Sequence, residues 1–269
     1  MESIVDLAKK KFLVIWEVEP PRRPNLNALI EISDAARDLT DVFLVPDCHL
    51  GKPSVSSLVI AQKFIEMNHP VIACLNARDR NEIAFKRDLL TAAVLGIDNL
   101  LFVHGDAPSQ GSKCSDLTVH KMLEITKAIE NTKEFGEDVS FTVGAAVKPG
   151  KNPAWKTHAD FWFVQASSNL DKLFSWRQSV NFDKPVFVAV IVLASYNMAS
   201  KLNQLIPDLD VPDSVLKALD NDSSFGIRYA AEQIEKIKQS GLFSGIHLIA
   251  GRKAKEFIPY LVTIVGSQV

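Results

Sequence analysis

Eight short runs rich in Val, Ile, Leu and Phe recur along the chain, and segments with helical patterning separate them. The runs predict strands at residues 12–19, 42–45, 71–75, 99–105, 139–147, 161–166, 186–194 and 245–251. They are almost continuously apolar, which is typical of parallel strands that are covered on both faces. Because strands joined by crossover helices form βαβ units, eight such units predict a TIM (β/α)8 barrel.

The intervening segments predict helices, and their spacing favours one closed unit. We expect helices at residues 25–39, 54–67, 79–95, 115–132, 170–181, 196–205 with 212–220, 223–240 and 252–263. A doubly wound sheet is the competing fold, but no G-x-G-x-x-G motif follows any expected strand. The 269 residues contain no evident linker or repeat, so the sequence predicts a single domain over residues 1–269.

Composition and charge exclude several classes of partner. The net charge is −2 and the Lys and Arg residues are scattered, so we expect no nucleic-acid partner. The longest apolar runs are too short to span a membrane, and the N-terminus lacks the layout of a signal peptide. The chain has three cysteines without C-x-x-C spacing, which indicates free thiols in a reducing cytoplasm. The group Cys48, His49 and Cys74 fits no common zinc pattern, so we assign no residue to a metal.

The first expected strand ends in the unusual sequence WEVEPP, at residues 16–21. Strand alternation places Leu13, Ile15, Glu17 and Glu19 on one face, which should point into the barrel. Glu17 then projects into the lumen and Glu19 lies at its rim. Burial in a poorly hydrated lumen favours the protonated form of a carboxylic acid, which is the form that a general acid needs.

Polar residues also gather where the other expected strands end. Active sites of TIM barrels lie at these carboxyl ends. The residues at this rim are Asp47, the segment 76–81, His104, Gly105, Asp106, Lys148, Gln165, Ser195 and Arg252.

Five motifs, in order and in spacing, resemble the methylenetetrahydrofolate reductase family. WEVEPP resembles the F-E-x-x-P-P start of these enzymes, and residues 77–108 carry an R-D-R-N signature and a G-D-x-P turn found in one branch. The stretches DCHLGKPSVSSLVIA (47–61), VGAAVKP (143–149) and VLASYNMASKLNQLIPDLDVPDSVLKAL (192–219) agree as well. The resemblance covers nearly the whole chain, and the family fold is a TIM barrel.

The resemblance implies a flavin, usually FAD, at the barrel mouth. Such enzymes pass a hydride from the flavin to 5,10-methylene-tetrahydrofolate and produce the 5-methyl form. By position, Glu17 is the expected general acid, Asp106 lies between flavin and folate as a second catalytic residue, and Gln165 binds the folate. We place Glu19 and Ser195 among the substrate-binding residues as well. The expected flavin-binding residues are Arg78, Asp79, Arg80, Asn81, His104, Gly105, Ala146 and Lys148.

Each assignment has a structural alternative. Glu17 would instead be a structural carboxylate paired with Arg78, Arg80 or Lys148. The charged residues from Arg78 to Arg80 would form a surface ion-pair cluster at a helix start. Asp106 would only make a turn, Gln165 would be a satisfied core amide, and Lys148 a solvated loop residue. The indoles Trp155, Trp162 and Trp176 are expected to pack rather than to stack on a pterin.

Two departures from the family pattern affect the cofactor and the substrate. The family has a full helix between strands five and six that contacts the FAD diphosphate, whereas residues 150–160 leave room for barely two turns. We therefore expect this helix to be shortened or missing, with Lys156 as a partial substitute, and keep FMN or no flavin as alternatives to FAD. Strand six reads VQASSN, which keeps Gln165 but replaces neighbouring family residues by Val164 and Asn169.

Two other functions stay open. One is an accessory relative that binds a pterin or a partner protein without catalysis. The other is a barrel that transfers methyl groups between a folate and a corrinoid protein. For the protein as a whole we expect a folate or related pterin as the substrate, an electron-donating partner subunit as an option, and a homo- or hetero-oligomer. If electrons reach a flavin here through an iron–sulfur cluster, that cluster lies on another subunit, because this chain has no cysteine spacing for one.

Overall fold

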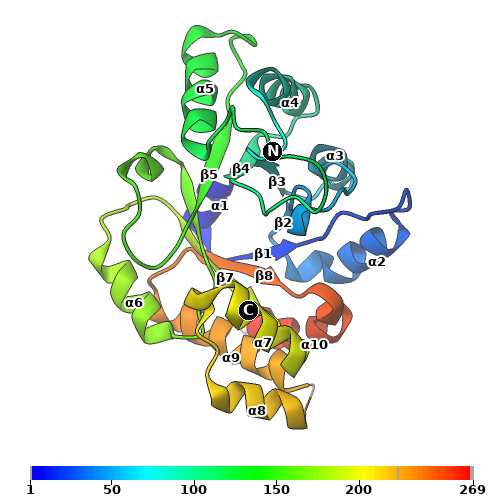
Figure 1. The fold of residues 1–269 in the computed structure, drawn as a ribbon, viewed down its shortest axis with the longest axis vertical. Helices are drawn as coiled ribbons and strands as arrows, with labels where there is room; N and C mark the ends of the chain where they lie inside the picture. The colour runs from blue at the N-terminus through cyan, green and yellow to red at the C-terminus, as the bar shows by residue number, and fades with distance from the viewer. Residues whose placement is uncertain (1, 223, 267–269) are drawn as a thin grey trace.

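Eight parallel strands form a closed barrel in the computed structural model, which describes residues 2–222 and 224–266 (Figure 1). Each strand pairs with the next one in the sequence, and the last pairs with the first. The TIM-barrel prediction is confirmed, and every expected strand overlaps an observed one. The strands are β1 (Leu13–Glu17), β2 (Val42–Val45), β3 (Val71–Asn76), β4 (Asn99–Val103), β5 (Thr142–Val147), β6 (Phe161–Val164), β7 (Val186–Ile191) and β8 (Gly245–Ile249).

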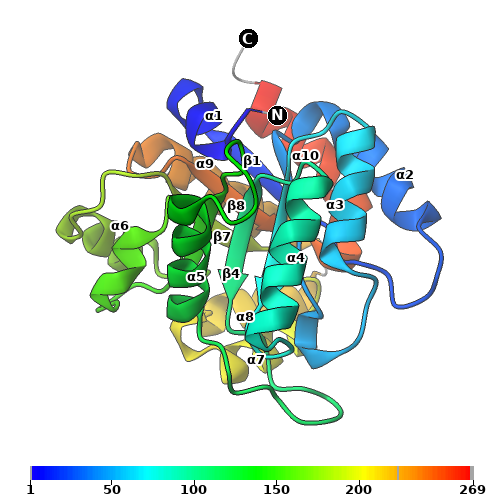
Figure 2. The ribbon, with the colours of Figure 1, turned by 90° about the horizontal axis from the view of Figure 1, so that it is seen from above.

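Helices surround the barrel, and its two ends carry different helices (Figure 2). One end carries α1 (Ile4–Lys10), and the other carries α7 (Tyr196–Leu205) and α8 (Asp213–Asn221). The remaining helices are α2 (Asn27–Ala36), α3 (Ser57–Glu66), α4 (Glu82–Val94), α5 (Val119–Thr132), α6 (Leu170–Ser179), α9 (Phe225–Ser240) and α10 (Ala254–Gly266). No helix within the described residues is long and apolar enough to cross a membrane.

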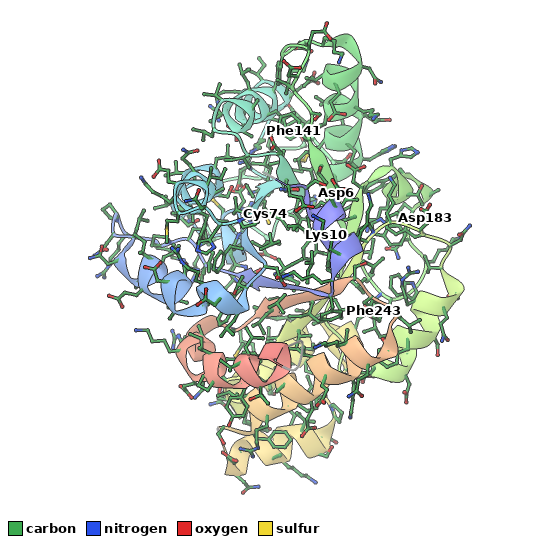
Figure 3. The ribbon with its side chains drawn as sticks, turned by 180° about the vertical axis from the view of Figure 1, so that it is seen from behind. Asp6, Lys10, Cys74, Phe141, Asp183 and Phe243 are labelled. Atoms are coloured by element: carbon green, nitrogen blue, oxygen red, sulfur yellow. The ribbon has the colours of Figure 1, made fainter. Side chains whose placement is uncertain are left out.

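The seven-residue helix α1, which the sequence analysis did not predict, closes the amino-terminal end of the barrel. Ser3 caps it by accepting the backbone N–H of Asp6, and the side chain of Ile4 packs among the lumen residues. Asn99 accepts the N–H of Ile4 at 3.0 Å. Asp6 and Lys10 of α1 accordingly appear near the middle of the ring in the view from behind (Figure 3).

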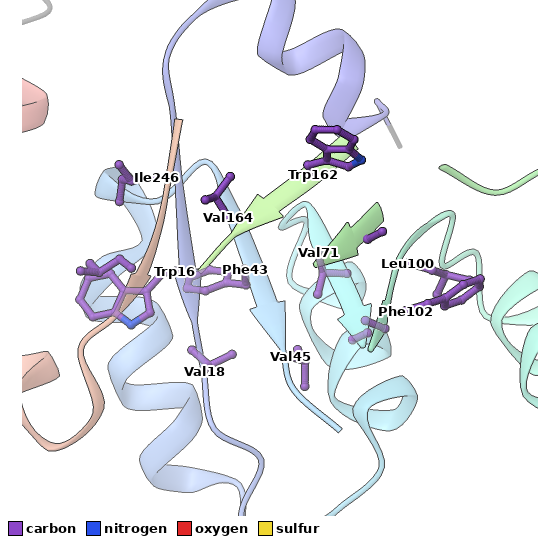
Figure 4. Packing of buried hydrophobic residues seen from close by; sticks show 14 of the residues in the cluster. Trp16, Val18, Phe43, Val45, Val71, Leu100, Phe102, Trp162, Val164 and Ile246 are labelled. Atoms are coloured by element: carbon purple, nitrogen blue, oxygen red, sulfur yellow. The ribbon is translucent and has the colours of Figure 1, made fainter. Parts of the chain in front are cut away.

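Strand alternation divides the core into two layers. Outward-facing residues such as Trp16 and Phe43 pack against the helices and belong to the larger cluster (Figure 4). Inward-facing residues such as Leu13 and Ile15 fill the lumen together with Phe161 and other apolar side chains. The lumen filling stops below the carboxyl ends of the strands, which leaves the mouth open.

The expected shortening of the helix between β5 and β6 is confirmed. Only a five-residue 3-10 helix, η3 (Ala154–His158), lies there, so the ring of helices is interrupted between α5 and α6 (Figure 1). Aromatic side chains pack beside this connection. Trp155 stacks on His120 of α5, with ring centres 5.1 Å apart. The Trp162 ring stacks 3.7 Å from Phe182, so these indoles pack as expected.

Candidate functional site

A cavity of about 540 Å³ opens at the carboxyl ends of the strands, and all eight strands or the residues directly after them contribute to its walls. Its apolar lining includes Leu44, Cys74, Leu101 and Phe163, while the small side chain of Ala146 leaves space. Burial raises the pKa of the Cys74 thiol well above its usual value, and the nearby Glu17 carboxylate adds to this effect. The thiol is therefore inert at neutral pH.

Glu17 ends β1 and lies in this cavity with its side chain only 14% exposed. Its Oε2 atom lies 3.0 Å from Nε2 of His247, which comes from the lumen face of β8. The His247 ring meets Phe163 edge-on, with 5.0 Å between ring centres, and is thereby held in place. Glu17 thus contacts a histidine rather than the arginines or the lysine that its structural alternative named.

Asp106 also lines the cavity and connects two loops at the mouth. Its Oδ2 accepts the backbone N–H of Leu50 at 2.8 Å, and its carbonyl accepts a guanidinium N–H of Arg78 at 2.7 Å. The preceding residue, Gly105, has φ of +88°, and a Cβ there would lie 3.1 Å from Cβ of Arg78. Glycine is needed at this position because other residues rarely adopt that backbone conformation.

The side chain of Arg80 lies in a buried ion-pair network rather than in the cavity. It contacts Asp47, whose side chain is 7% exposed, and it donates from Nε to Asp88 at 2.8 Å. Asn76 adds amide hydrogen bonds to Asp47. Burial opposes the charged form of Arg80, but the two carboxylates outweigh it and raise its pKa. The network links the carboxyl ends of β2 and β3 to α4 beside the mouth.

The neighbouring residues of the R-D-R-N signature also have partners inside the protein. Arg78 is 3% exposed and pairs with Asp79, and this hydrogen bond lowers the pKa of the Asp79 carboxyl. Asn81 caps α4 by accepting the N–H of Ala84. His104 is exposed. None of these four side chains lines the cavity, and the cluster is partly buried rather than a surface feature.

The remaining predicted residues divide between the cavity and its surroundings. Gln165 and Lys148 line the cavity, Gln165 half-buried and Lys148 exposed. Ser195 caps α7 by accepting the N–H of Met198, and Glu19 is exposed and paired with Arg22 at 3.1 Å. The structure therefore brings together Glu17, Gly105, Asp106, Ala146, Lys148 and Gln165.

A family model settles the relationship that this geometry suggests. The model for methylenetetrahydrofolate reductase matches residues 1–261. The chain belongs to this family. No curated protein matches the chain at a significant level.

Solved structures share the barrel of this methylenetetrahydrofolate reductase family member at low sequence identity. An uncharacterized protein from Clostridium thermocellum, which binds two copies of 5-methyl-5,6,7,8-tetrahydrofolic acid, has a TM-score of 0.63 and 16% identity, covering 98% of this chain and 100% of that one. The EDTA monooxygenase EmoA from Chelativorans sp. BNC1 has a TM-score of 0.56 and 11% identity, covering 96% and 94%. A tryptophan synthase complex from Pyrococcus furiosus has a TM-score of 0.54 and 13% identity, covering 94% and 98%. These likenesses show the fold alone.

The chemistry of the cavity fits a flat, mainly apolar ring better than it fits the whole of FAD. Its apolar walls and the space above Ala146 suit a flavin ring, and Lys148 and Lys156 offer two amines to an anionic group. The guanidinium groups of Arg78 and Arg80 are paired with carboxylates, and the connection between β5 and β6 contains only η3 in place of a full helix. The residues present therefore fit a flavin with one phosphate.

Two residues of this family member's mouth were not assigned a role from the sequence. His247 lies within the expected eighth strand. The sequence feature that could have revealed its role is that it is a titratable residue at an inward position between apolar neighbours. Asp47 was noted only as a residue at a strand end, although it is the buried partner of Arg80. Among the described residues, no group of three His, Cys, Asp or Glu side chains is arranged to hold a metal ion.

Proposed function

We propose that this protein binds a reduced folate at the barrel mouth and reduces 5,10-methylene-tetrahydrofolate to the 5-methyl form with the help of a flavin. The carrying observation is the inward-facing Glu17, hydrogen-bonded to His247 in a cavity that also contains Gln165. Family membership and the folate bound by the Clostridium thermocellum protein of the same fold support this choice.

In this proposal Glu17 acts as the general acid. Opening the five-membered ring of the substrate breaks a carbon–nitrogen bond, and the departing nitrogen must receive a proton, which Glu17 supplies. The imidazole of His247, 3.0 Å from Oε2, orients the carboxyl group and can donate a hydrogen bond to the carboxylate that remains. A flavin bound in the cavity would supply the hydride.

Other residues of the mouth bind and orient the substrate. The amide of Gln165 can accept and donate hydrogen bonds to the edge of a pterin ring. Apolar residues of the lining, such as Leu44, Phe163 and Ile249, limit the access of water to Glu17, whose side chain is 14% exposed. The closure of the opposite end by α1 means that ligands and protons enter from the mouth.

The substitution Glu17→Gln tests this proposal. It removes the proton donor with little change in shape, and we expect turnover of methylene-tetrahydrofolate to fall about 100-fold or more. Reduction of any bound flavin by dithionite should stay unchanged, because it does not need this proton. Glu31→Gln, on an exposed residue of α2, is the control and should behave as the unmodified protein. Wild-type folate turnover in the Glu17 variant would show that another group is the acid.

A second candidate is a folate-binding protein without redox activity, which the occupied arginines and the missing helix favour. The two candidates differ in colour. A purified protein with a flavin absorption band and folate-dependent reoxidation supports the reductase. A colourless protein that binds 5-methyl-tetrahydrofolate, and that takes up no added flavin, supports the second candidate.

A further inference from the structure

The short connection between β5 and β6 brings two lysines to one end of the mouth cavity. Lys148 follows β5, and Lys156 lies in η3, the short 3-10 helix of this connection. Both line the cavity. The Nζ atom of Lys156 donates to the carbonyl oxygen of Ala146 at 2.6 Å and approaches Oδ1 of Asn152 at 3.5 Å. The amine is therefore held by neutral groups at the edge of the lumen.

The positive charge of this pair is poorly compensated. Within the described residues, no ion pair joins Lys156 to a carboxylate, and the ion pair of Lys148 with Asp208 is long, at 3.9 Å. Burial lowers the pKa of Lys156, and the cation of Lys148 lowers it further. An anion placed between the two amines would offset both the burial and the mutual repulsion.

The two arginines of the R-D-R-N segment do not extend this positive region. Arg78 is paired with Asp79, and Arg80 is paired with Asp47 and Asp88. Neither arginine lines the cavity. The lysine pair thus offers room for one anionic group, whereas the diphosphate of FAD would need further donors.

We infer that Lys148 and Lys156 form a subsite for a single anionic group of the ligand at the mouth, so that the adenylate half of FAD adds no affinity. Two ligands carry such a group: flavin mononucleotide through its phosphate, and a folate through the carboxylates of its glutamate tail. The assignment of these ligands rests on the proposed function, whereas the anion subsite itself rests on the lysine pair.

Paired ligands that differ only in the anionic group test the subsite. We would measure dissociation constants of flavin mononucleotide, riboflavin and FAD, and of 5-methyl-tetrahydrofolate and its analogue without glutamate. If the subsite binds one of these anionic groups, the ligand that carries the group should have a dissociation constant about tenfold or more below that of its partner without the group. The double variant Lys148→Met/Lys156→Met should abolish that ratio. Lys151→Met, on an exposed lysine of the same connection that does not line the cavity, should preserve it.

The results distinguish a flavin phosphate from a folate carboxylate as the bound group, and they test the subsite separately from the proposed function. If the dissociation constants differ only within the flavin pair, the subsite binds the flavin phosphate. If they differ only within the folate pair, it binds a carboxylate of the glutamate tail. Equal affinities within both pairs, or FAD binding ten times more tightly than flavin mononucleotide, overturn the inference. If the protein binds no flavin and no folate, the proposed function fails. Acetylation of Lys156 by acetic anhydride then decides the subsite, which is retained if inorganic phosphate protects this amine and rejected if it does not.

Discussion

Replacing Arg80 by methionine tests whether the R-D-R-N segment holds the fold or the ligand. Methionine keeps most of the aliphatic volume but removes the guanidinium. The side chain of Asp47, 7% exposed, then loses its ion pair, and Asp88, 14% exposed, loses its buried partner. Removing one member of a buried ion pair usually costs about 3–5 kcal/mol, because the remaining charge stays buried.

The lower end of this range applies here. Asp47 keeps hydrogen bonds from the backbone and side chain of Asn76, and Asp88 keeps an ion pair with Arg87 at 2.9 Å. We therefore expect the free energy of unfolding to fall by about 3 kcal/mol. In a domain of this size, that corresponds to a fall of about 6–12 °C in the midpoint of thermal unfolding.

Arg87 provides a matched control because it pairs with the same carboxylate from the solvent side. Its side chain is 70% exposed, so Arg87→Met should cost at most about 1 kcal/mol. Urea unfolding monitored by tryptophan fluorescence measures both variants.

The relative cost of the two substitutions decides the outcome. Unfolding of Arg80→Met at the same urea concentration as the Arg87 variant would refute a structural role for the Arg80 guanidinium. Unchanged stability with loss of ligand binding would also refute it, because the guanidinium would then serve the cavity.

Two further perturbations address packing and acid stability. A Cβ on Gly144 would lie 2.0 Å from Cε2 of the fully buried Phe161. Gly144→Ala should therefore lower the free energy of unfolding, measured with urea, by about 1–3 kcal/mol. Adding Phe161→Leu should recover part of this loss. The hydrogen bond with Arg78 lowers the pKa of Asp79 in the folded protein, so the unfolded chain binds a proton at this carboxyl more readily. The ionised Asp79 therefore stabilises the folded state, and this contribution is lost as the pH falls through the lowered pKa. Asp79→Asn should therefore flatten the decline in stability below about pH 4, measured as urea midpoints across that range, and an unchanged slope would contradict the assignment.

Local pattern was sufficient for the architecture and for the direction of Glu17. The eight apolar runs and the segments between them fixed the barrel, because parallel strands covered on both faces need continuous apolar sequence. Period-two alternation placed Glu17 inward, and the length of residues 150–160 indicated the shortened helix. The helix α1 escaped prediction because seven residues are too few for a clear periodic pattern.

The partners of the charged residues depended on the closed barrel. The family resemblance led us to expect that Arg78 and Arg80 bind a flavin, and in the folded chain each lies beside a carboxylate. Asp47, the partner of Arg80, lies 33 residues away, and Glu17 meets His247 across 230 residues of sequence. Such pairs cannot be read from neighbouring residues.

The sequence by itself determined that the chain closes into a barrel with an acidic residue facing inward at its mouth. The tertiary structure alone decided which charges are satisfied inside the protein and which stay available to a ligand. The physical reason is that periodicity is a local property of the backbone, whereas burial and ion pairing depend on the atoms that closure brings together. The lysine pair at the mouth shows this most clearly. Its two lysines line the cavity, whereas the nearby arginines are paired with carboxylates and do not.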